Sequence, residues 1–285
     1  MAHLAAAKRR SAQELRRPEL MGLGQEQRAS RSSARGWIPV VAVVTVLSLW
    51  EGAARLGIIP RLYFPPPTEI GAALWTSIVR GELGPALWAT LSRVIPGLLL
   101  GTVPGLLLGV AMGRSRAVRR VADPFIAALH PIPKIALLPL LMIILGIGEA
   151  SRIAVVAIAA FFPMMINAMA GVRRISPLYF EVARNYGASR LKVFTRVVLP
   201  GSLPMVLSGL RLSANVAFLV TIAVEIVASD SGLGALIWLS WEILRVELLY
   251  AVLVVISIFG VTLNMGLGGL AAWLAPWQAT MDEAA

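Results

Sequence analysis

The chain has 285 residues, of which 58% are apolar and only 14% are charged, and it carries 26 Lys and Arg against 15 Asp and Glu. Soluble domains average about 45 to 50% apolar and about 25% charged residues, so this composition excludes an ordinary soluble domain and indicates an integral membrane protein. Cysteine is absent, which excludes disulfides, thiolate catalysis and cysteine-based metal sites.

The N-terminal segment, residues 1–36, is rich in Ala, Arg, Gln and Ser and precedes the first apolar run. A basic stretch before an apolar one is also the pattern of a secretory signal peptide. Here the basic stretch is long, and no clean small-x-small cleavage site follows the apolar run. We therefore expect a cytoplasmic tail that is disordered or lies on the lipid surface.

Six apolar runs are long enough to cross a bilayer, for which a helix needs about 20 residues. The expected spans are 37–54, 86–112, 122–146, 151–171, 205–228 and 248–274. Most basic residues fall in the tail, in the loop after the second span and in segment 172–204, all on one side of the membrane. By the positive-inside rule that side is the cytoplasm, and this topology explains the basic excess better than a nucleic-acid partner does. The sequence thus predicts an all-α domain with six transmembrane helices over 37–277, with short cytoplasmic tails at 1–36 and 278–285.

A glycine stands at every fourth position of the second span. Such a ridge lets another helix backbone approach closely. Packing within one subunit is the simpler interpretation, and a subunit interface is the alternative. The helix-packing residues are Gly97, Gly101, Gly105, Gly109 and Gly113.

The third span is expected to begin with Asp123 as a cap and Pro124 at the first helical position. It then breaks at the sequence HPIPK, where two prolines remove amide donors, and Pro139 removes a third. Broken helices point to transport paths in membrane proteins, while a kink buried by neighbouring helices is the alternative. Candidate path residues are His130, Pro131, Pro133, Lys134, Asn215 and Thr221.

Each polar candidate also has a structural interpretation. Lys134 either favours an anion in transit or bonds the free carbonyls and snorkels to a wet cleft. For His130, a hydrogen bond to the broken backbone is favoured over metal ligation, since no second ligand is near, and no metal site is expected. Asn215 and Thr221 either line the path or bond a neighbouring helix.

Charged groups at bilayer depth are costly, which makes Arg93, Arg211 and Glu225 conspicuous. Arg93 in the second span and Glu225 late in the fifth both lie near the outer side by topology. We expect them to form an intramembrane ion pair, because removing either partner would leave a buried charge uncompensated. A gate or substrate contact is the alternative.

Segment 172–204 is predicted to form a helical hairpin on the cytoplasmic surface. One helix is expected over 177–186, a turn at Gly187, and a second, amphipathic helix over 189–198 that is halted at Leu199-Pro200-Gly201. Small residues at the turn allow a partner to close tightly around it. The residues expected to contact that partner are Glu181, Ala183, Arg184, Gly187, Ala188, Leu199 and Pro200.

The sequence EVARNYG, followed later by VVLP, resembles the "EAA" signature of ABC-transporter importer permeases. Glu181, Ala183, Gly187 and the Leu199-Pro200 pair match the signature, whereas Val182 stands where alanine is usual. Residues 60–277 resemble the branch that imports nitrate, aliphatic sulfonates, taurine and related small anions, and importers of pyrimidine precursors are close relatives.

This resemblance implies a multi-pass subunit of a bacterial inner membrane that forms the translocation path rather than an enzyme. Two permease copies, a homodimer, would pair with two cytoplasmic ATPase subunits that hold ATP and Mg, and an external binding protein would deliver the substrate. The chain itself has no G-x-x-x-x-G-K-S/T loop and needs no cofactor.

Two rival classes make different predictions. A secondary transporter driven by an ion gradient should show paired intramembrane acids, whereas Glu225 is the only acid deep in a predicted span. An intramembrane enzyme should show a Ser, His or Asp constellation at depth, and the sequence offers none.

Overall fold

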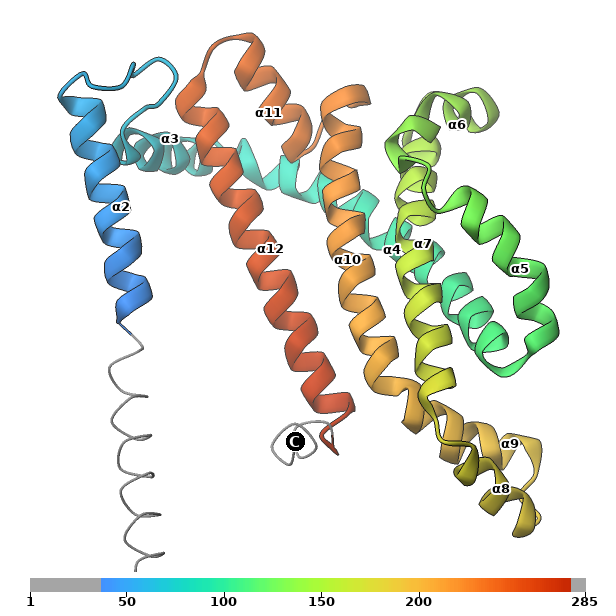
Figure 1. Ribbon diagram of the computed structural model, residues 1–285. Helices are drawn as coiled ribbons and strands as arrows, with labels where there is room; N and C mark the ends of the chain where they lie inside the picture. The colour runs from blue at the N-terminus through green and yellow to red at the C-terminus, as the bar shows by residue number, and fades with distance from the viewer. Residues whose placement is uncertain (1–36, 278–285) are drawn as a thin grey trace, which may run out of the picture. The chain divides into compact units, whose positions relative to one another are not determined.

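The computed structural model describes residues 37–277, and every regular element in that range is helical (Figure 1). The α-helices are α2 (Ile38–Arg55), α3 (Pro67–Val79), α4 (Leu83–Arg114), α5 (Arg116–Leu129), α6 (Leu138–Leu145), α7 (Glu149–Arg174), α8 (Pro177–Asn185), α9 (Arg190–Val193), α10 (Leu199–Ala228), α11 (Leu233–Glu242) and α12 (Val246–Leu274). A 3₁₀ turn, η1 (Lys134–Leu137), precedes α6, and a π turn, η2 (Phe194–Val198), joins α9 to α10. The tails at 1–36 and 278–285 lie outside the described residues.

Five of these helices are long and apolar enough to cross a membrane, and α5 with α6 makes a sixth span if the bent pair is counted as one. This confirms the predicted all-α membrane fold with its six apolar runs. Some helices are longer than the predicted spans: α4 begins three residues before its predicted start and α10 begins six residues before it. Two helices were not predicted, α3 and α11, because both are too short to span and lie in segments read as loops.

The chain divides into two compact units, residues 1–69 and 70–285. In the first, the loop after α2 folds back on that helix through Glu51. Its carboxylate accepts hydrogen bonds from the Thr68 amide (3.1 Å) and hydroxyl (2.8 Å). Glu51 thereby supplies an acceptor for a first-turn amide of α3, a group that no intrahelical bond satisfies.

In the second unit, α4 packs along α7 through the glycine ridge. A Cβ atom on Gly105 would lie 2.7 Å from the Phe161 carbonyl oxygen, and one on Gly97 would lie 2.6 Å from the Val156 Cγ1. Gly101, Gly109 and Gly113 meet α7 in the same way. The ridge therefore serves close helix packing within one chain, because any side chain there would push the two backbones apart.

The third span is broken as the prolines predict, with α5 and α6 bent by 90° across residues 130–133. The expected start at Asp123 is wrong. Ser115 caps α5, its hydroxyl accepting from the Val118 amide, and Pro124 lies inside the helix. Pro139 does not break the helix either, because it occupies the first turn of α6, where no intrahelical amide donor is required.

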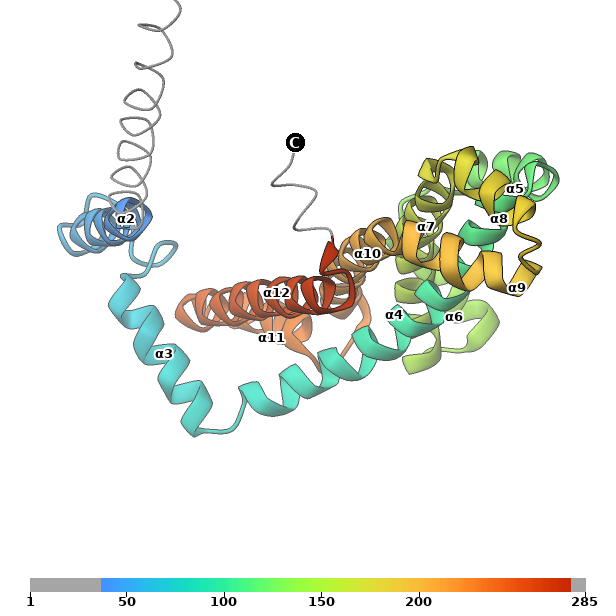
Figure 2. The same cartoon turned by 90° about the horizontal axis from the view of Figure 1, so that it is seen from below.

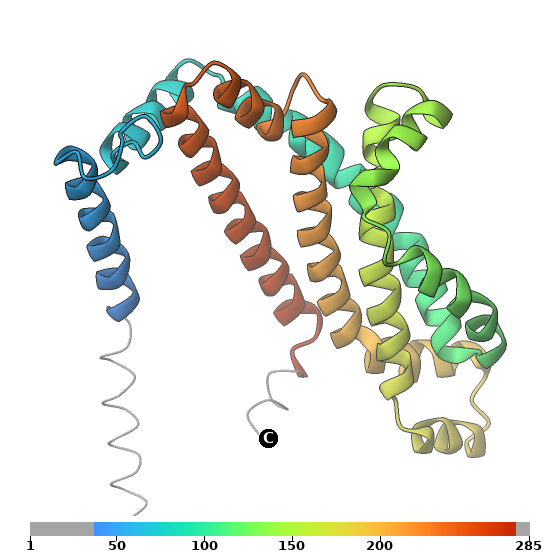
Figure 3. The ribbon, with the colours of Figure 1, turned by 45° about the horizontal axis from the view of Figure 1, so that its top comes forward.

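The predicted stop at Leu199-Pro200-Gly201 is also wrong. The chain runs from α9 through η2 into α10 without a break, and Figure 3 shows α10 rising directly from the hairpin. In η2 the Leu199 amide bonds the Phe194 carbonyl, five residues back. A proline clashes with the carbonyl four residues before it in a regular helix, and the wider π turn directly before Pro200 relieves this conflict.

Candidate functional site: an exposed hairpin and a buried ionic cluster

The hairpin α8–α9 projects from one end of the second unit, beyond the ends of α7 and α10 (Figures 1 and 3). Ser176 caps α8 and Ser189 caps α9, each hydroxyl accepting a backbone amide at 3.4 Å. Between them Gly187 has φ +67°, and the amides of Gly187 and Ala188 bond the carbonyls of Arg184 and Ala183, each at 2.9 Å. This pair of bonds is a Schellman motif, which ends α8 and turns the chain sharply.

Helix α8 has two different faces. Pro177, Phe180, Glu181, Arg184 and Ala188 line a cavity between the hairpin and the bundle. The opposite side exposes large apolar and aromatic side chains: Leu178, Tyr179, Val182 and Tyr186, the last 87% exposed. Such a contiguous exposed patch is typical of a protein interface. Of the residues that the sequence predicts to face outward at the turn, Glu181 and Gly187 are exposed, and Glu181 and Ala188 also line the cavity.

A buried ionic cluster lies at the opposite end of the same unit, where α4, α7 and α10 meet the segment before α11. The Arg93 side chain is 2% exposed, and Glu225 is completely buried. Arg93 Nη1 donates to Glu225 Oε1 at 2.8 Å, so the two residues form an ion pair. Arg93 also makes a bidentate pair with Glu149, through Nε and Nη2, both at 2.7 Å. The remaining Arg93 protons go to the Ser231 carbonyl and hydroxyl, so all five donors are used.

Glu225 is equally well satisfied. Its Oε2 accepts from the Thr90 hydroxyl and from the Gly234 amide, each at 2.9 Å. Sequence reasoning missed Glu149, Thr90 and Ser231, which complete the cluster. Glu149 follows the third span in the loop sequence GIGEAS. An acid at the start of the next span, on the same side of the membrane as Arg93, was the signal that could have indicated a second partner for Arg93. A fully bonded cluster of this kind fixes the relative positions of the helices that carry it.

At the broken third span Lys134 satisfies the freed backbone. Its Nζ donates to the carbonyls of Leu129 (2.9 Å), His130 (2.8 Å) and Ile132 (2.8 Å), and it lies 4.6 Å from the centre of the Phe162 ring. An ammonium has three protons, and all three are engaged here. The lysine therefore acts as a C-terminal cap of α5, which leaves none of its donors for a passing anion in this conformation.

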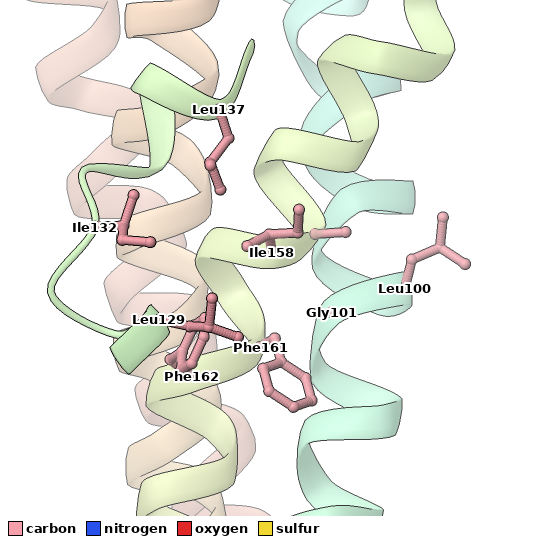
Figure 4. A pocket seen from close by; sticks show the side chains of 9 residues that line it. Leu100, Gly101, Leu129, Ile132, Leu137, Ile158, Phe161 and Phe162 are labelled. Carbon is pink, nitrogen blue, oxygen red and sulfur yellow. The ribbon is translucent and has the colours of Figure 1, made fainter. Parts of the chain in front are cut away.

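A pocket of about 380 Å³ lies beside the break, between α4, α5 and α7 (Figure 4). Its lining is apolar: Leu100, Gly101, Leu129, Ile132, Leu137, Ala157, Ile158, Phe161 and Phe162. The His130 ring packs against Phe162 with ring centroids 5.3 Å apart, and among residues 37–277 it does not make the expected hydrogen bond to the broken backbone. Because the lining lacks charged groups, this pocket suits an apolar occupant and not a charged solute.

The two polar candidates of the fifth span bond within the protein. Asn215 on α10 and Asn264 on α12 exchange side-chain hydrogen bonds of 3.2 and 3.0 Å, which ties the two helices together. Thr221 is buried and donates to the Ala217 carbonyl of its own helix. The Asn215 contact corresponds to the alternative of a bond to a neighbouring helix, whereas the Thr221 bond stays within α10 and matches neither interpretation.

The fold and these sites define a class: an all-helical membrane permease with an exposed surface hairpin. Residues 101–280 match the family described as "Binding-protein-dependent transport system inner membrane component". The chain belongs to this family, and it is a permease subunit of an ABC importer.

Three relatives match this chain over most of its length and over most of their own. The chain is 35% identical over 250 residues to the taurine transport system permease protein TauC of Escherichia coli, covering 86% of this chain and 91% of the relative. It is 33% identical over 217 residues to the putative aliphatic sulfonates transport permease protein SsuC of the same species, covering 76% and 82%. The Bacillus subtilis protein of the same description is 29% identical over 79% of this chain and 82% of its own length.

Among solved structures, two inward-facing crystal forms of the MetNI methionine ABC transporter share the fold. Their TM-scores are 0.58 and 0.61, with 21% and 20% identity, and they cover 65% and 66% of this chain and 92% and 94% of the matched chains. At this identity the match concerns the fold alone.

Proposed function

We propose that this permease carries a small sulfonate, such as taurine or an alkyl sulfonate, into the cytoplasm. Support comes from the identity of 35% to a taurine permease across 86% of the chain. Nitrate and pyrimidine precursors, which the resemblance also allowed, have less support, since neither appears among the relatives described above.

The observation that carries the coupling part of this proposal is the exposed hairpin. A Schellman turn fixes α8 against α9, and an aromatic patch on α8 faces away from the bundle. A cytoplasmic ATPase subunit would bind this patch, so that closure of the ATPase moves α9 and α10 as one body. Two copies of the permease, two ATPase subunits and an external binding protein complete the proposed assembly, with Glu181, Ala183, Gly187 and Leu199-Pro200 shaping the hairpin.

Transport driven by ATP distinguishes this function from a gradient-driven carrier. The permease is reconstituted with its cognate ATPase and binding protein, and uptake of labelled taurine is measured with ATP inside the vesicles. We expect uptake only with ATP and the binding protein together, and competition by alkyl sulfonates stronger than by nitrate or sulfate. Uptake driven by an ion gradient without ATP would refute the proposal.

Orientation is testable because the chain has no native cysteine. A single cysteine at Asn185, exposed in the hairpin, should react with an impermeant thiol reagent only from the cytoplasmic side. A cysteine at Ile147, which is 86% exposed in the loop between α6 and α7, should react only from outside. The reverse pattern would place the hairpin where no ATPase can reach it.

A further inference from the structure

A second cavity, of about 750 Å³, lies behind the hairpin and is strongly basic. Its walls come from the ends of α4 and α7, the start of α5, and from α8 and α9, which cluster when the unit is seen from below (Figure 2). The arginines that line it are Arg114, Arg116, Arg119, Arg173, Arg184 and Arg190. Glu181 is the one acid in the lining.

Within the described range 37–277, these arginines have no carboxylate counter-ion. Within residues 37–277, none of the six guanidinium groups lies within 4.0 Å of a carboxylate oxygen, as the ion pairs of this range all involve other arginines. Arg114 lies over the Phe180 ring, 5.7 Å from its centre, in a cation–π contact that leaves the net positive charge in place. Six like charges around one cavity repel one another, so the arrangement favours a bound anion.

The positive-inside rule alone accounts for basic residues on this side, but it does not explain their convergence. Charges that only set topology are free to spread over a solvated surface. Here three helix-end segments and both helices of the hairpin direct arginines at one cavity of ligand size. Guanidinium groups match the oxygens of a phosphate through bidentate hydrogen bonds, which makes phosphate the anion that this site fits best.

The rest of the lining indicates the source of that phosphate. Val172, Ile175, Pro177, Phe180 and Val193 give the cavity an apolar portion beside the arginines. The cavity also lies where α4 and α7 end, and therefore where lipid headgroups meet the spans. A mixed basic and apolar lining at that depth fits an amphiphile better than free phosphate or a carboxylate of a partner protein, and basic pockets between transmembrane helices are known headgroup sites.

We propose that this cavity binds the phosphodiester headgroup of an anionic phospholipid. The lipid acts as the counter-ion that holds the hairpin, through Arg184 and Arg190, to the bundle, through Arg114, Arg116, Arg119 and Arg173. Binding therefore stabilises the position of the hairpin that the ATPase contacts. This site is independent of the transported substrate.

The test is a lipid titration of the purified full-length permease in neutral detergent. Phosphatidylglycerol, phosphatidylcholine and inorganic phosphate are added separately, and bound lipid is counted by native mass spectrometry while the thermal unfolding midpoint is recorded. We expect phosphatidylglycerol alone to bind tightly and to raise the midpoint. Equal stabilisation by inorganic phosphate would overturn the lipid assignment in favour of a soluble anion.

Two double variants with the same change in net charge separate the cavity from the general surface. Arg116→Gln/Arg184→Gln removes arginines of the cavity, whereas Lys192→Gln/Arg196→Gln removes basic groups of the same exposed segment that do not line it. We expect phosphatidylglycerol affinity to fall at least about tenfold in the first variant and less than about threefold in the second.

Equal losses in the two variants would reduce the effect to surface attraction and overturn the proposal. Unchanged lipid affinity with lost ATPase association in the first variant would overturn it too, in favour of an acidic protein partner. Should that variant not fold, Arg116→Lys/Arg184→Lys keeps the charge but not the bidentate geometry. It should fold as judged by size-exclusion chromatography and bind phosphatidylglycerol with reduced affinity, and undiminished affinity would count against the arginine site.

Discussion

Single residues decide whether charge inside the bundle is structural or functional. Glu225 is completely buried, and its two oxygens are occupied by Arg93, Thr90 and Gly234. Glu149 holds the same arginine but is 52% exposed. Both carboxylates therefore pair with Arg93, Glu149 through two bonds in a half-exposed position and Glu225 through one bond in a buried position.

Replacing Glu225 should be far more destabilising than replacing Glu149. Glu225→Gln leaves Arg93 without its buried partner, and breaking a buried pair costs about 3–5 kcal/mol. Glu149→Gln removes a solvated partner, for which about 1 kcal/mol is expected. Thermal unfolding of the purified permease measures both. If Glu225→Gln left stability unchanged but altered the KM for uptake, the pair would be a gate or substrate contact instead.

Lys134 is predicted to stabilise the break rather than to select anions. Lys134→Met leaves the carbonyls of Leu129, His130 and Ile132 without their donor, at a cost of about 1–3 kcal/mol. The unfolding midpoint should fall while the KM for the sulfonate changes little. Lys134→Arg, which retains a donor, serves as the control. A large rise in KM at full stability would instead assign the lysine to the path.

At the scale of elements, the glycine ridge brings α4 and α7 into backbone contact. At each of the five ridge glycines a Cβ atom would lie less than 3.0 Å from an atom of α7, which is closer than van der Waals contact allows. Gly84 belongs to the same helix but has open space around its Cβ position. Helix α4 therefore contains glycines in close contact with α7, such as Gly105, and one with open space around it, Gly84. Substitutions at Gly105 and Gly84 can be compared within the same helix.

Gly105→Ala should destabilise the permease and Gly84→Ala should not. The added methyl at position 105 meets the Phe161 carbonyl, a backbone atom that cannot move alone, and overpacking of this kind costs about 1–3 kcal/mol. At position 84, alanine favours the helix by up to about 1 kcal/mol. Unfolding midpoints of the two variants provide the comparison, and equal midpoints would contradict the packing role.

The sequence predicted these elements well where hydrophobic length or proline determined them. The six apolar runs, the break after Leu129 and the turn at Gly187 all follow from local chemistry. It failed where distant residues cooperate. The bonds of Glu149 to Arg93 join positions 56 residues apart. At Pro200 the sequence indicated a helix stop, because a proline can either end a helix or be accommodated by a π turn before it. Helix α11 was missed because it is too short to span.

At the scale of the whole molecule, the proposed coupling requires that movement of the hairpin be transmitted to the bundle. The base of the hairpin is held by close packing: a Cβ on Gly171 would lie 2.9 Å from the Met205 Cβ, and one on Gly201 would lie 3.0 Å from Ile175. These contacts join the end of α7 to the start of α10, so movement of the hairpin acts on both spans together.

Removal of the aromatic patch should uncouple the permease from its ATPase without unfolding it. Tyr179→Ala/Tyr186→Ala deletes two exposed rings that contribute little to the fold, so the unfolding midpoint should stay unchanged. Interface aromatics are frequent hot spots, and co-purification of the ATPase should fall at least about tenfold. Trp88→Ala, which removes a ring 71% exposed on α4, is the control.

Two substitutions, Gly187→Asn and Gly187→Val, test the hairpin turn. Asparagine tolerates the φ of +67° found there, whereas valine strains the backbone at this φ. Neither side chain would clash, because nothing lies within 4 Å of a Cβ atom at this position. The valine variant and, separately, Glu181→Lys should each weaken ATPase association while the permease stays folded. The asparagine variant should retain ATPase association. An intact complex from both damaging variants would contradict the coupling role.

The π turn at Phe194–Val198 sets the angular phase between the hairpin and the fifth span. A π turn corresponds to one residue inserted into a regular helix, and one residue corresponds to a rotation of about 100°. Loss of that residue would leave α10 seated in the bundle while pointing the hairpin sideways. In the proposed assembly, the direction in which the hairpin meets the ATPase thus depends on the number of residues in this turn as well as on their side chains.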